Sequence, residues 1–534
     1  MSKNRIAEER LQKLLEGNPE IFARGSLIGI EKESLRVTAE GDIAQTPHPR
    51  ALGSALTHRY ITTDFSEALL EFITPPCADV RDTLECMNDV HRFVYANLDR
   101  DELLWTSSMP CKVAGDASVR LAEYGSSNVG TMKNVYRRGL GYRYGRLMQA
   151  IAGVHFNYSF SPELWPVFQT LLGNRDGLQR FISDSYFALI RNFQRQGWLV
   201  PYLFGSSPVV CKSFLGAKAD GFRDLDGGSW YQPYATTLRM SDIGYKNKSQ
   251  ASLRISYDNV DAYIESLTRA IETPNPEYQA IGVVVDGEYR QLNANILQIE
   301  NEYYSFIRPK RVARSGEKPT VALAERGVEY VEVRALDVSA FDPSGVNEDQ
   351  MRFLEALLVF CVLRQSDPIS DQDRLDIEHN QQAVATRGRQ PGLTLRRHGR
   401  DVELRQWAQE ICTAMQGICT LLDAGDAHGA YSQALERQRE GIADPECLPS
   451  ARMLAEMAAS DESFFQYSMR LSREHRDFFV DAPLTDAQRE RFEAEASRSL
   501  AEQRDIEASD NSSFAEYLES YFRQTAIDSK KLSA

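Results

Sequence analysis

Hydrophobic and polar residues alternate along several short segments in the first two thirds of the chain. Alternating or β-branched residues predict six strands: Leu27–Val37, Leu69–Thr74, Val154–Phe160, Ile281–Val285, Arg290–Gln298 and Val328–Val338. Apolar residues spaced three and four apart predict helices over Val80–Leu98 and Gln179–Gln196. This part of the chain is therefore expected to mix strands and helices.

From about residue 345 onward the pattern is almost wholly helical. Thr485–Gln488 and Ser513–Glu516 are capping-box patterns that open charged amphipathic helices. The apolar run Phe353–Leu363 is far shorter than the ~20 residues of a membrane span and predicts a buried helix. We divide the chain approximately into a catalytic α+β region, residues 1–345, and a mainly helical region, residues 346–534, packed on it.

The net charge of the chain makes two classes of binding partner unfavourable. A formal charge of −15 repels phosphate backbones and anionic lipids, so we expect neither a nucleic-acid nor a membrane partner. The N-terminus lacks the apolar stretch of a signal peptide, which predicts a cytoplasmic protein.

The cysteines show no pairing pattern. They stand at Cys77, Cys86, Cys111, Cys211, Cys361, Cys412, Cys419 and Cys447, without a CxxC pair or a Cys/His cluster. A chain of this size needs no disulfide, so we expect reduced thiols throughout. Cys361, Cys412 and Cys419 are expected in the core.

Candidate chemistry begins on the first predicted strand. Because strand side chains alternate, Glu31 and Glu33 project from the same face, roughly 6.5–7 Å apart. Such paired carboxylates suit hard cations. They would be costly in a core unless metal ions or arginines neutralised them. The alternative is a solvated strand end with a charged fringe.

Two further segments supply carboxylates. Glu71 interrupts an apolar strand and is expected to be buried and paired, whereas Asp64 lies in the preceding turn, where a capping role is the alternative. Glu332 and Arg334 share a strand face, which would set a metal-binding carboxylate beside a guanidinium that can hold phosphate. A simple intrastrand ion pair explains that pattern equally well.

One histidine and a cationic stretch complete the inventory. His155 lies in an apolar strand-like segment, where a lone histidine is more often a core residue than a ligand. Positive charge gathers around Arg239 and within Asn301–Arg311, which suggests phosphate or carboxylate recognition. A solvated basic loop is the alternative for Lys310 and Arg311.

No standard nucleotide motif is present. Gly125–Thr131 has the two glycines of a P-loop but lacks the lysine and Ser/Thr that should follow. A bound nucleotide would therefore need carboxylate-held metal ions to handle its phosphates.

Several long and unusual segments resemble the proteobacterial glutamate–cysteine ligases. These segments are Gly29–Val37, Gly53–His58, Ile61–Phe65, Leu69–Pro75, Ser108–Cys111, Tyr202–Pro208, Leu297–Glu302, Ile307–Arg311, Arg314–Glu317 and Tyr330–Arg334. The similarity spans nearly all of residues 20–400. Beyond residue 400 it is weaker, so no functional residue is carried over there.

The resemblance implies a glutamine-synthetase-like α+β fold. A curved antiparallel sheet would form an active-site funnel surrounded by helices, with a helical C-terminal region. The implied metal ligands are Glu31, Glu33, Asp64, Glu71, His155 and Glu332. Glutamate contacts are implied for Arg239, Asn301 and Tyr304, and a cysteine pocket for Tyr136, Tyr245 and Phe65. Arg334, with Glu33 and Glu71, takes a catalytic role toward the transferred phosphoryl group.

The resemblance also implies the reaction. ATP would phosphorylate the γ-carboxylate of glutamate, and the cysteine amine would attack the acyl phosphate to give γ-glutamylcysteine, ADP and phosphate, the first step of glutathione biosynthesis. Mg²⁺, or Mn²⁺ in its place, would neutralise the phosphates. The logic of the pathway suggests inhibition by glutathione, and we expect a monomer.

Two other classes of protein stay open. A ligase with another amine acceptor, or a guanidino kinase with a similar sheet, would keep the metal cluster and change the acceptor pocket. A non-enzymatic metal or small-molecule binding protein would bind magnesium without producing ADP.

Overall fold

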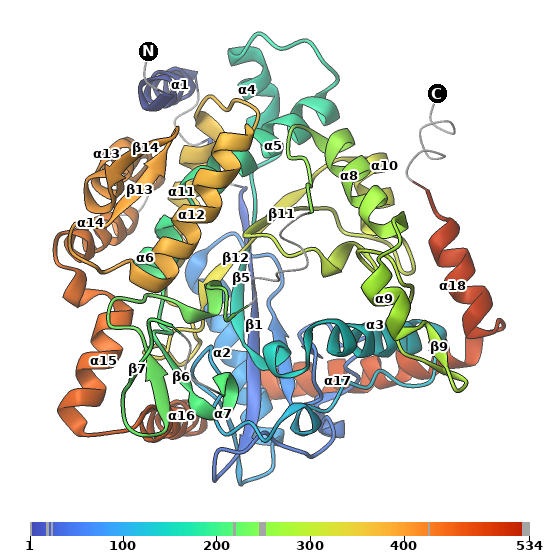
Figure 1. Ribbon diagram of the computed structural model, residues 1–534. Helices are drawn as coiled ribbons and strands as arrows, with labels where there is room; N and C mark the ends of the chain where they lie inside the picture. Colours follow the sequence, from blue (N-terminus) through green and yellow to red (C-terminus); the bar gives the residue numbers. More distant parts are fainter. Residues whose placement is uncertain are drawn as a thin grey trace.

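A large antiparallel sheet runs through the middle of the molecule, with helices around it (Figure 1). The computed structural model describes residues 3–17, 21–22, 25–216, 220–244, 253–424 and 428–525. Within these ranges no helix has both the length and the apolar character needed to cross a membrane.

Seven strands form this sheet in the described part of the chain. Their order is β11-β12-β5-β1-β3-β2, with β4 paired to the C-terminal end of β1. The strands are β1 Leu27–Thr38, β2 Ile61–Thr63, β3 Leu69–Ile73, β4 Glu102–Leu104, β5 Gly153–Ser159, β11 Ile307–Lys310 and β12 Tyr330–Asp337. The predictions for β1, β3, β5 and β12 are confirmed to within a few residues.

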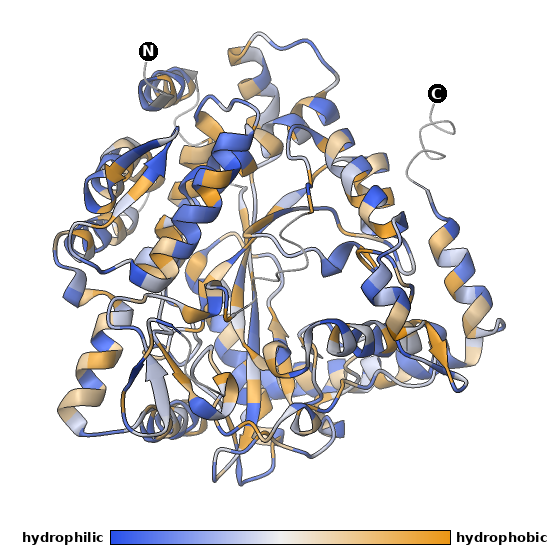
Figure 2. Ribbon diagram, in the orientation of Figure 1, coloured by the Kyte–Doolittle hydropathy of each residue, from blue (hydrophilic) through white to orange (hydrophobic). Residues whose placement is uncertain are grey.

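Helices cover the face of the sheet that points away from the candidate site. They are α2 Val80–Asn97, α5 Leu178–Gln196, α6 Leu199–Phe204 and α11 Glu348–Leu363. Residues Phe353–Leu363 of α11 are all buried, as predicted. The α11 carboxylate Glu355 accepts hydrogen bonds from Tyr158 of β5 at 3.2 Å and from Tyr431 at 2.6 Å. Most helices carry both hydrophobic and hydrophilic segments in Figure 2, as expected for elements with one buried face.

The opposite face of the sheet is bordered by α3 (Asn128–Tyr144) and by the segment around residues 300–306. Other helices of the first two thirds are α1 Lys3–Gly17, α4 Leu164–Leu171, α7 Lys212–Leu215, α8 Val260–Glu272, α9 Pro276–Ile281 and α10 Pro319–Arg326. A small sheet joins β6 Val209–Cys211, β7 Arg223–Asp224 and β8 Ser229–Tyr231.

The C-terminal third contains α12 Asp371–Arg387, α13 Leu404–Leu422, α14 Ala430–Ala443, α15 Pro449–Ser460, α16 Phe464–Asp481, α17 Asp486–Ser509 and α18 Phe514–Arg523. Both predicted capping boxes, which open α17 and α18, are confirmed. The almost wholly helical pattern has one exception, the hairpin of β13 Thr394–Arg397 and β14 Arg400–Glu403. Its tight turn uses His398 and Gly399, both with positive φ.

Of the two strands predicted over residues 281–298, the first is confirmed only at its end and the second is wrong. Ile281 ends α9, Val284–Val285 forms the two-residue strand β9, which pairs with β10 Glu288–Tyr289, and no strand lies within Arg290–Gln298. Side chains replace the expected ladder: Gln291 donates to the Tyr278 carbonyl at 2.7 Å, and Gln298 accepts from the Leu292 amide at 3.0 Å. Such local bonds compete with strand pairing.

The prediction of eight reduced cysteines is also wrong for one pair. Cys111 and Cys211 form a disulfide with their Cα atoms 5.3 Å apart. The two residues are 100 positions apart in sequence, so no local sequence pattern predicts the disulfide. Cys361, Cys412 and Cys419 are buried free thiols, as predicted.

Candidate active site

A cavity of about 270 Å³ opens on the sheet face that borders α3. Its walls carry carboxylates, cations and aromatic side chains from segments far apart in sequence. The lining residues are Glu31, Glu33, Asp64, Phe65, Glu71, Tyr136, Arg137, Leu140, Tyr144, Gln149, His155, Asn301, Glu302, Tyr304, Arg308, Lys310, Glu332 and Arg334. All the predicted site residues except Arg239 and Tyr245 are in this set. We call it the catalytic cavity.

Strand register explains why the carboxylates meet. Glu31 of β1 pairs with His155 of β5, and two residues along the same strand Glu33 pairs with Glu71 of β3. Directly paired residues on antiparallel strands have side chains on the same face. Glu31 and Glu33 therefore share a face, as expected, and each has a polar residue of a neighbouring strand beside it on that face.

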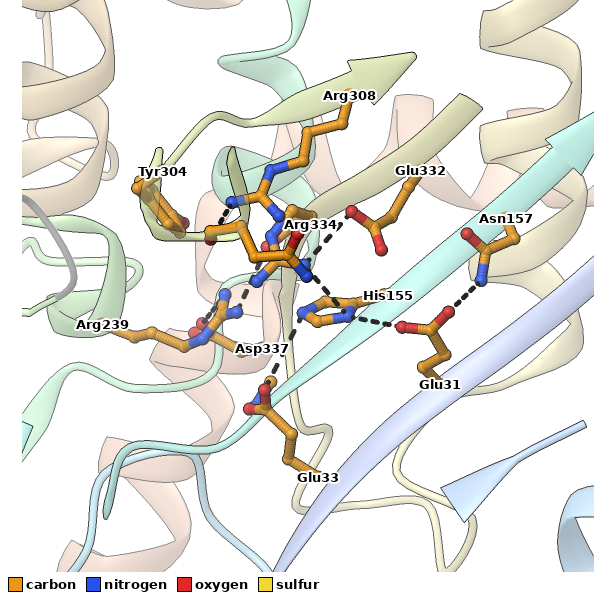
Figure 3. A network of polar contacts seen from close by, with 12 residues as sticks. Glu31, Glu33, His155, Asn157, Arg239, Tyr304, Arg308, Glu332, Arg334 and Asp337 are labelled. Carbon is orange, nitrogen blue, oxygen red and sulfur yellow. Dashed lines mark hydrogen bonds and ion pairs between the residues drawn. The ribbon is translucent and has the colours of Figure 1, made fainter. Parts of the chain in front are cut away.

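Glu31, His155 and Glu332 form a compact group of potential metal ligands. Each offers an atom that lies within 4.8 Å of the others. His155 Nδ1 is 3.1 Å from Glu31 Oε2, and Asn157 Nδ2 donates to Glu31 Oε1 at 3.0 Å (Figure 3). His155 is thus a buried histidine among carboxylates, and burial together with the nearby Arg334 lowers its pKa. A neutral imidazole is the form that binds a metal ion.

A second group of carboxylates lies beside the first. Burial and the neighbouring Asp64 raise the pKa of Glu33 to about 8. Burial and the charge of Glu31 raise the pKa of Glu71 well above its usual value. The Gly153 amide donates to Glu33 Oε2 at 2.5 Å. Carboxylates crowded in this way need positive charge between them in order to ionise together.

Cations from β11 and β12 face these carboxylates. Glu332 accepts from Lys310 Nζ at 3.1 Å and from Arg334 Nη1 at 3.2 Å, so the intrastrand ion pair considered from sequence is present. Burial opposes ionisation of Glu332, but Lys310 and then Arg334 outweigh it and hold its pKa well below the usual value. The same glutamate both pairs with cations and belongs to the ligand group.

A β-bulge sets the position of Arg334. The register between β12 and β5 shifts between Val333 and Leu336, so two residues of β12 oppose His155. Bulges bend a strand and redirect its side chains. Arg334 Nη1 consequently lies 3.5 Å from His155 Nδ1 (Figure 3).

Two features of the lining were not predicted from sequence: which of Lys310 and Arg311 lies in the cavity, and the stripe of side chains from α3. Lys310 lines the cavity, whereas Arg311 binds the carbonyls of Arg326 and Gly327 outside it. Alternation along β11, which also places Arg308 in the cavity, could have separated the two. Tyr136, Leu140 and Tyr144 form a stripe along α3, at a four-residue spacing that could have been read from sequence.

Arg239 lies beside the cavity rather than in its lining. Its side chain is 1% exposed, and its Nη2 donates to the Arg334 carbonyl at 3.2 Å (Figure 3). A Cβ at Gly153 would collide with this guanidinium, so a glycine leaves room for it. The glutamate contact assigned to Arg239 stays a prediction. Tyr245 lies outside the described residues.

An antiparallel sheet that gathers carboxylates and cations on one face, with helices around it, is the arrangement expected of a glutamine-synthetase-like enzyme. The family model for glutamate–cysteine ligase matches residues 11–384. The chain belongs to the glutamate–cysteine ligase family.

Similar proteins align with nearly the whole length of this chain. A glutamate–cysteine ligase from Alcanivorax borkumensis is 49% identical over 96% of this chain and 99% of its own. One from Azotobacter vinelandii is 48% identical over 97% and 98%. The crystal structure of a Francisella tularensis glutamate–cysteine ligase in complex with AMP superposes with a TM-score of 0.89 at 37% identity, covering 95% of this chain and 98% of that one.

Proposed function

We propose that this chain joins the γ-carboxylate of glutamate to the amine of cysteine with ATP, giving γ-glutamylcysteine, ADP and phosphate, and that the catalytic cavity performs the reaction. This is the first step of glutathione biosynthesis. The observation that carries the assignment of the site is the convergence of carboxylates from β1, β3 and β12 with His155 on one cavity, opposite Arg334. The family membership and the AMP-bound relative support the choice of substrates.

The residues present fit Mg²⁺. Glu31 and Glu332 offer the hard carboxylate oxygens that this ion prefers, with His155 between them and its Nε2 without a hydrogen-bond partner in the described structure. Glu33, Asp64 and Glu71 would hold further ions, since their mutual repulsion favours added positive charge. Bound Mg²⁺ would neutralise phosphate oxygens and align donor with acceptor.

The chain's own groups supply the remaining chemistry. Arg334, fixed by the bulge and by Glu332, offers a guanidinium fork to the phosphoryl group as it moves from ATP to the γ-carboxylate. Asn301 and Tyr304 line the wall where glutamate would bind. Phe65 and Tyr136 supply an apolar surface for cysteine, whose neutral amine then attacks the acyl phosphate and expels phosphate.

Glutathione carries the same γ-glutamyl and cysteinyl groups as the two substrates. We therefore propose that it competes for the catalytic cavity. The protein would act in the cytoplasm, where ATP and both amino acids are present.

Release of ADP tests the assignment directly. We expect ADP in the presence of Mg²⁺ only when glutamate and cysteine are supplied together, with one γ-glutamylcysteine formed per ADP. Other amines in place of cysteine measure acceptor choice. Equal ADP release with an unrelated amine, or none with the pair, would contradict the proposal.

A further inference from the structure

A second and larger cavity lies away from the catalytic cavity. Its volume is about 790 Å³, and it lies between α5, α12, α13 and the β13–β14 hairpin, on the side of the molecule where α1 packs (Figure 1). It shares no lining residue with the catalytic cavity. The residues that matter for its chemistry are Arg195, Gln196, Arg364, Arg396, Arg397 and Trp407. We call it the arginine cavity.

The floor of the arginine cavity contains polar groups without partners. Gln196 is 2% exposed, and neither its Oε1 nor its Nε2 has a hydrogen-bond partner in the described structure. The same holds for Nε and Nη1 of the neighbouring Arg195. A buried polar group without a hydrogen-bond partner destabilises the folded protein. A donor-rich floor of this kind is suited to a polar ligand.

Three of the four carboxylates in the lining are already engaged. Asp373 pairs with Arg195 at 3.2 Å, and Glu410 pairs with Arg397 at 2.9 Å. Asp376 accepts from Gln372 at 2.7 Å and from the Gly399 amide at 2.8 Å. The fourth, Glu8 of α1, is exposed to solvent. The bonds of the first three leave them little capacity to neutralise another cation.

Arg364 is a half-buried cation of the lining without an ion-pair partner. No carboxylate lies within ion-pair distance of it among the described residues, and its Nε has no hydrogen-bond partner there. Burial, with a smaller effect from Arg397 and Arg195, lowers its pKa to about 10. A half-buried guanidinium beside two others favours binding of an anion.

We propose that the arginine cavity binds a small metabolite through a carboxylate or phosphate group, held by Arg364 and Arg195. Guanidinium groups bind both oxyanions in a forked, two-bond geometry. Gln196, with a donor and an acceptor to offer, would contact a neighbouring polar group of the ligand. Trp407, which is 6% exposed and has Arg397 over its ring at 5.3 Å, supplies an apolar wall.

Calorimetric titration of the full chain with inorganic phosphate and with succinate tests this site. The catalytic cavity carries Arg334→Gln in every sample, so that anion binding there is suppressed. Two variants remove the proposed contacts, Arg364→Gln and Gln196→Met. Arg400→Gln on the same hairpin is the matched control, since Arg400 is exposed and outside the cavity lining.

We expect at least one of the two anions to bind, and each contact variant to raise its Kd by about tenfold or more, equivalent to ~1.4 kcal/mol. The control should change Kd less than about twofold. The anion with the lower Kd shows whether the site prefers a phosphate or a carboxylate group. Gln196→Met should not lower the melting temperature, because it replaces an unsatisfied buried amide with an apolar side chain of similar volume. Absence of binding up to about 20 mM of both anions, or unchanged binding in both contact variants, would overturn the proposal.

Discussion

At the scale of single residues, the catalytic cavity depends on carboxylates that are buried together. Glu33 is 4% exposed, and burial with the nearby Asp64 raises its pKa to about 8. Glu332 is equally buried but has Lys310 and Arg334 as partners, so its pKa moves in the opposite direction. Two glutamates on one sheet face therefore differ in charge because of their neighbours, and not because of their depth.

Glu33→Gln separates catalysis from stability. Loss of a carboxylate proposed to hold a metal ion should lower the rate of ADP release by at least about 100-fold, the upper end of what changes outside the ligand shell cause. The melting temperature should not fall, because the variant removes a buried ionisable group. Glu329→Gln, on an exposed residue just before β12, is the control. Near-normal turnover of Glu33→Gln at saturating Mg²⁺ would exclude Glu33 as a ligand.

Arg334→Lys tests the guanidinium at the bulge. Lysine keeps the charge but offers no fork, so kcat should fall by roughly 10²–10³, as when one transition-state donor is removed. The KM for glutamate should change much less, since the contact is assigned to the phosphoryl group. Steady-state kinetics with ADP detection measures both. An increase in KM with unchanged kcat would assign Arg334 to substrate binding instead.

At the scale of elements, side chains of α17 hydrogen-bond to the turn that leads into β2. Ser499 Oγ accepts from the Ser54 amide at 3.0 Å, and Glu495 Oε1 accepts from the Arg59 amide at 3.0 Å. The same segment leads on to Asp64 and Phe65 in the catalytic cavity. The C-terminal region is therefore in contact with a site-forming segment, although sequence reasoning assigned it no function.

Gly53→Ala tests this contact, with Gly115→Ala as the control. Both glycines share a conformation with φ near +80°, Gly53 at φ 82° and ψ −156°, and Gly115 at φ 80° and ψ 176°. Alanine there costs about 1–3 kcal/mol at either position. At Gly53 the new Cβ would also lie 2.8 Å from the Cα of Ala496 in α17, whereas at Gly115 nothing lies within 4 Å.

Urea denaturation should therefore show a larger loss of stability for Gly53→Ala, by a further ~1–3 kcal/mol from overpacking. Equal losses of unfolding free energy for the two variants would show that α17 moves to accept the added methyl group and does not hold the turn in place.

At the scale of the whole molecule, several buried or half-buried histidines link stability to pH. Burial lowers the pKa of His48 to about 3, that of His58 to about 4 and that of His475 to about 3. The unfolded chain binds protons at these residues below pH ~6.5, whereas the folded chain does not. Stability should therefore be constant with respect to these groups above pH 7 and fall as the pH drops from about 6.5 toward 4.

One such histidine contributes up to about 2 kcal/mol of this loss at pH 5. His475→Gln should reduce the difference in unfolding free energy between pH 7.5 and pH 5 by about that amount. His398→Asn, at an exposed turn residue with positive φ that asparagine tolerates, is the control. A His475 variant with the wild-type pH dependence would show that this imidazole is protonated in the folded protein.

Local pattern predicted much of the fold and part of the site. Alternation was sufficient for β1, β3, β5 and β12, because their buried faces impose a two-residue period. It failed over residues 290–298, where the side chains of Gln291 and Gln298 bond to backbone groups in place of a ladder. The division of the chain at residue 345 stays a prediction.

Sequence alone is enough to place Glu31 and Glu33 on one strand face, because side-chain direction in a strand is a local property. Their partners depend on how the whole chain folds. Register placed His155 and Glu71 opposite them, a bulge brought Arg334 to His155, and packing joined Cys111 to Cys211. Each of these contacts joins segments far apart along the chain, so its energy depends on chain folding that no short stretch of sequence encodes.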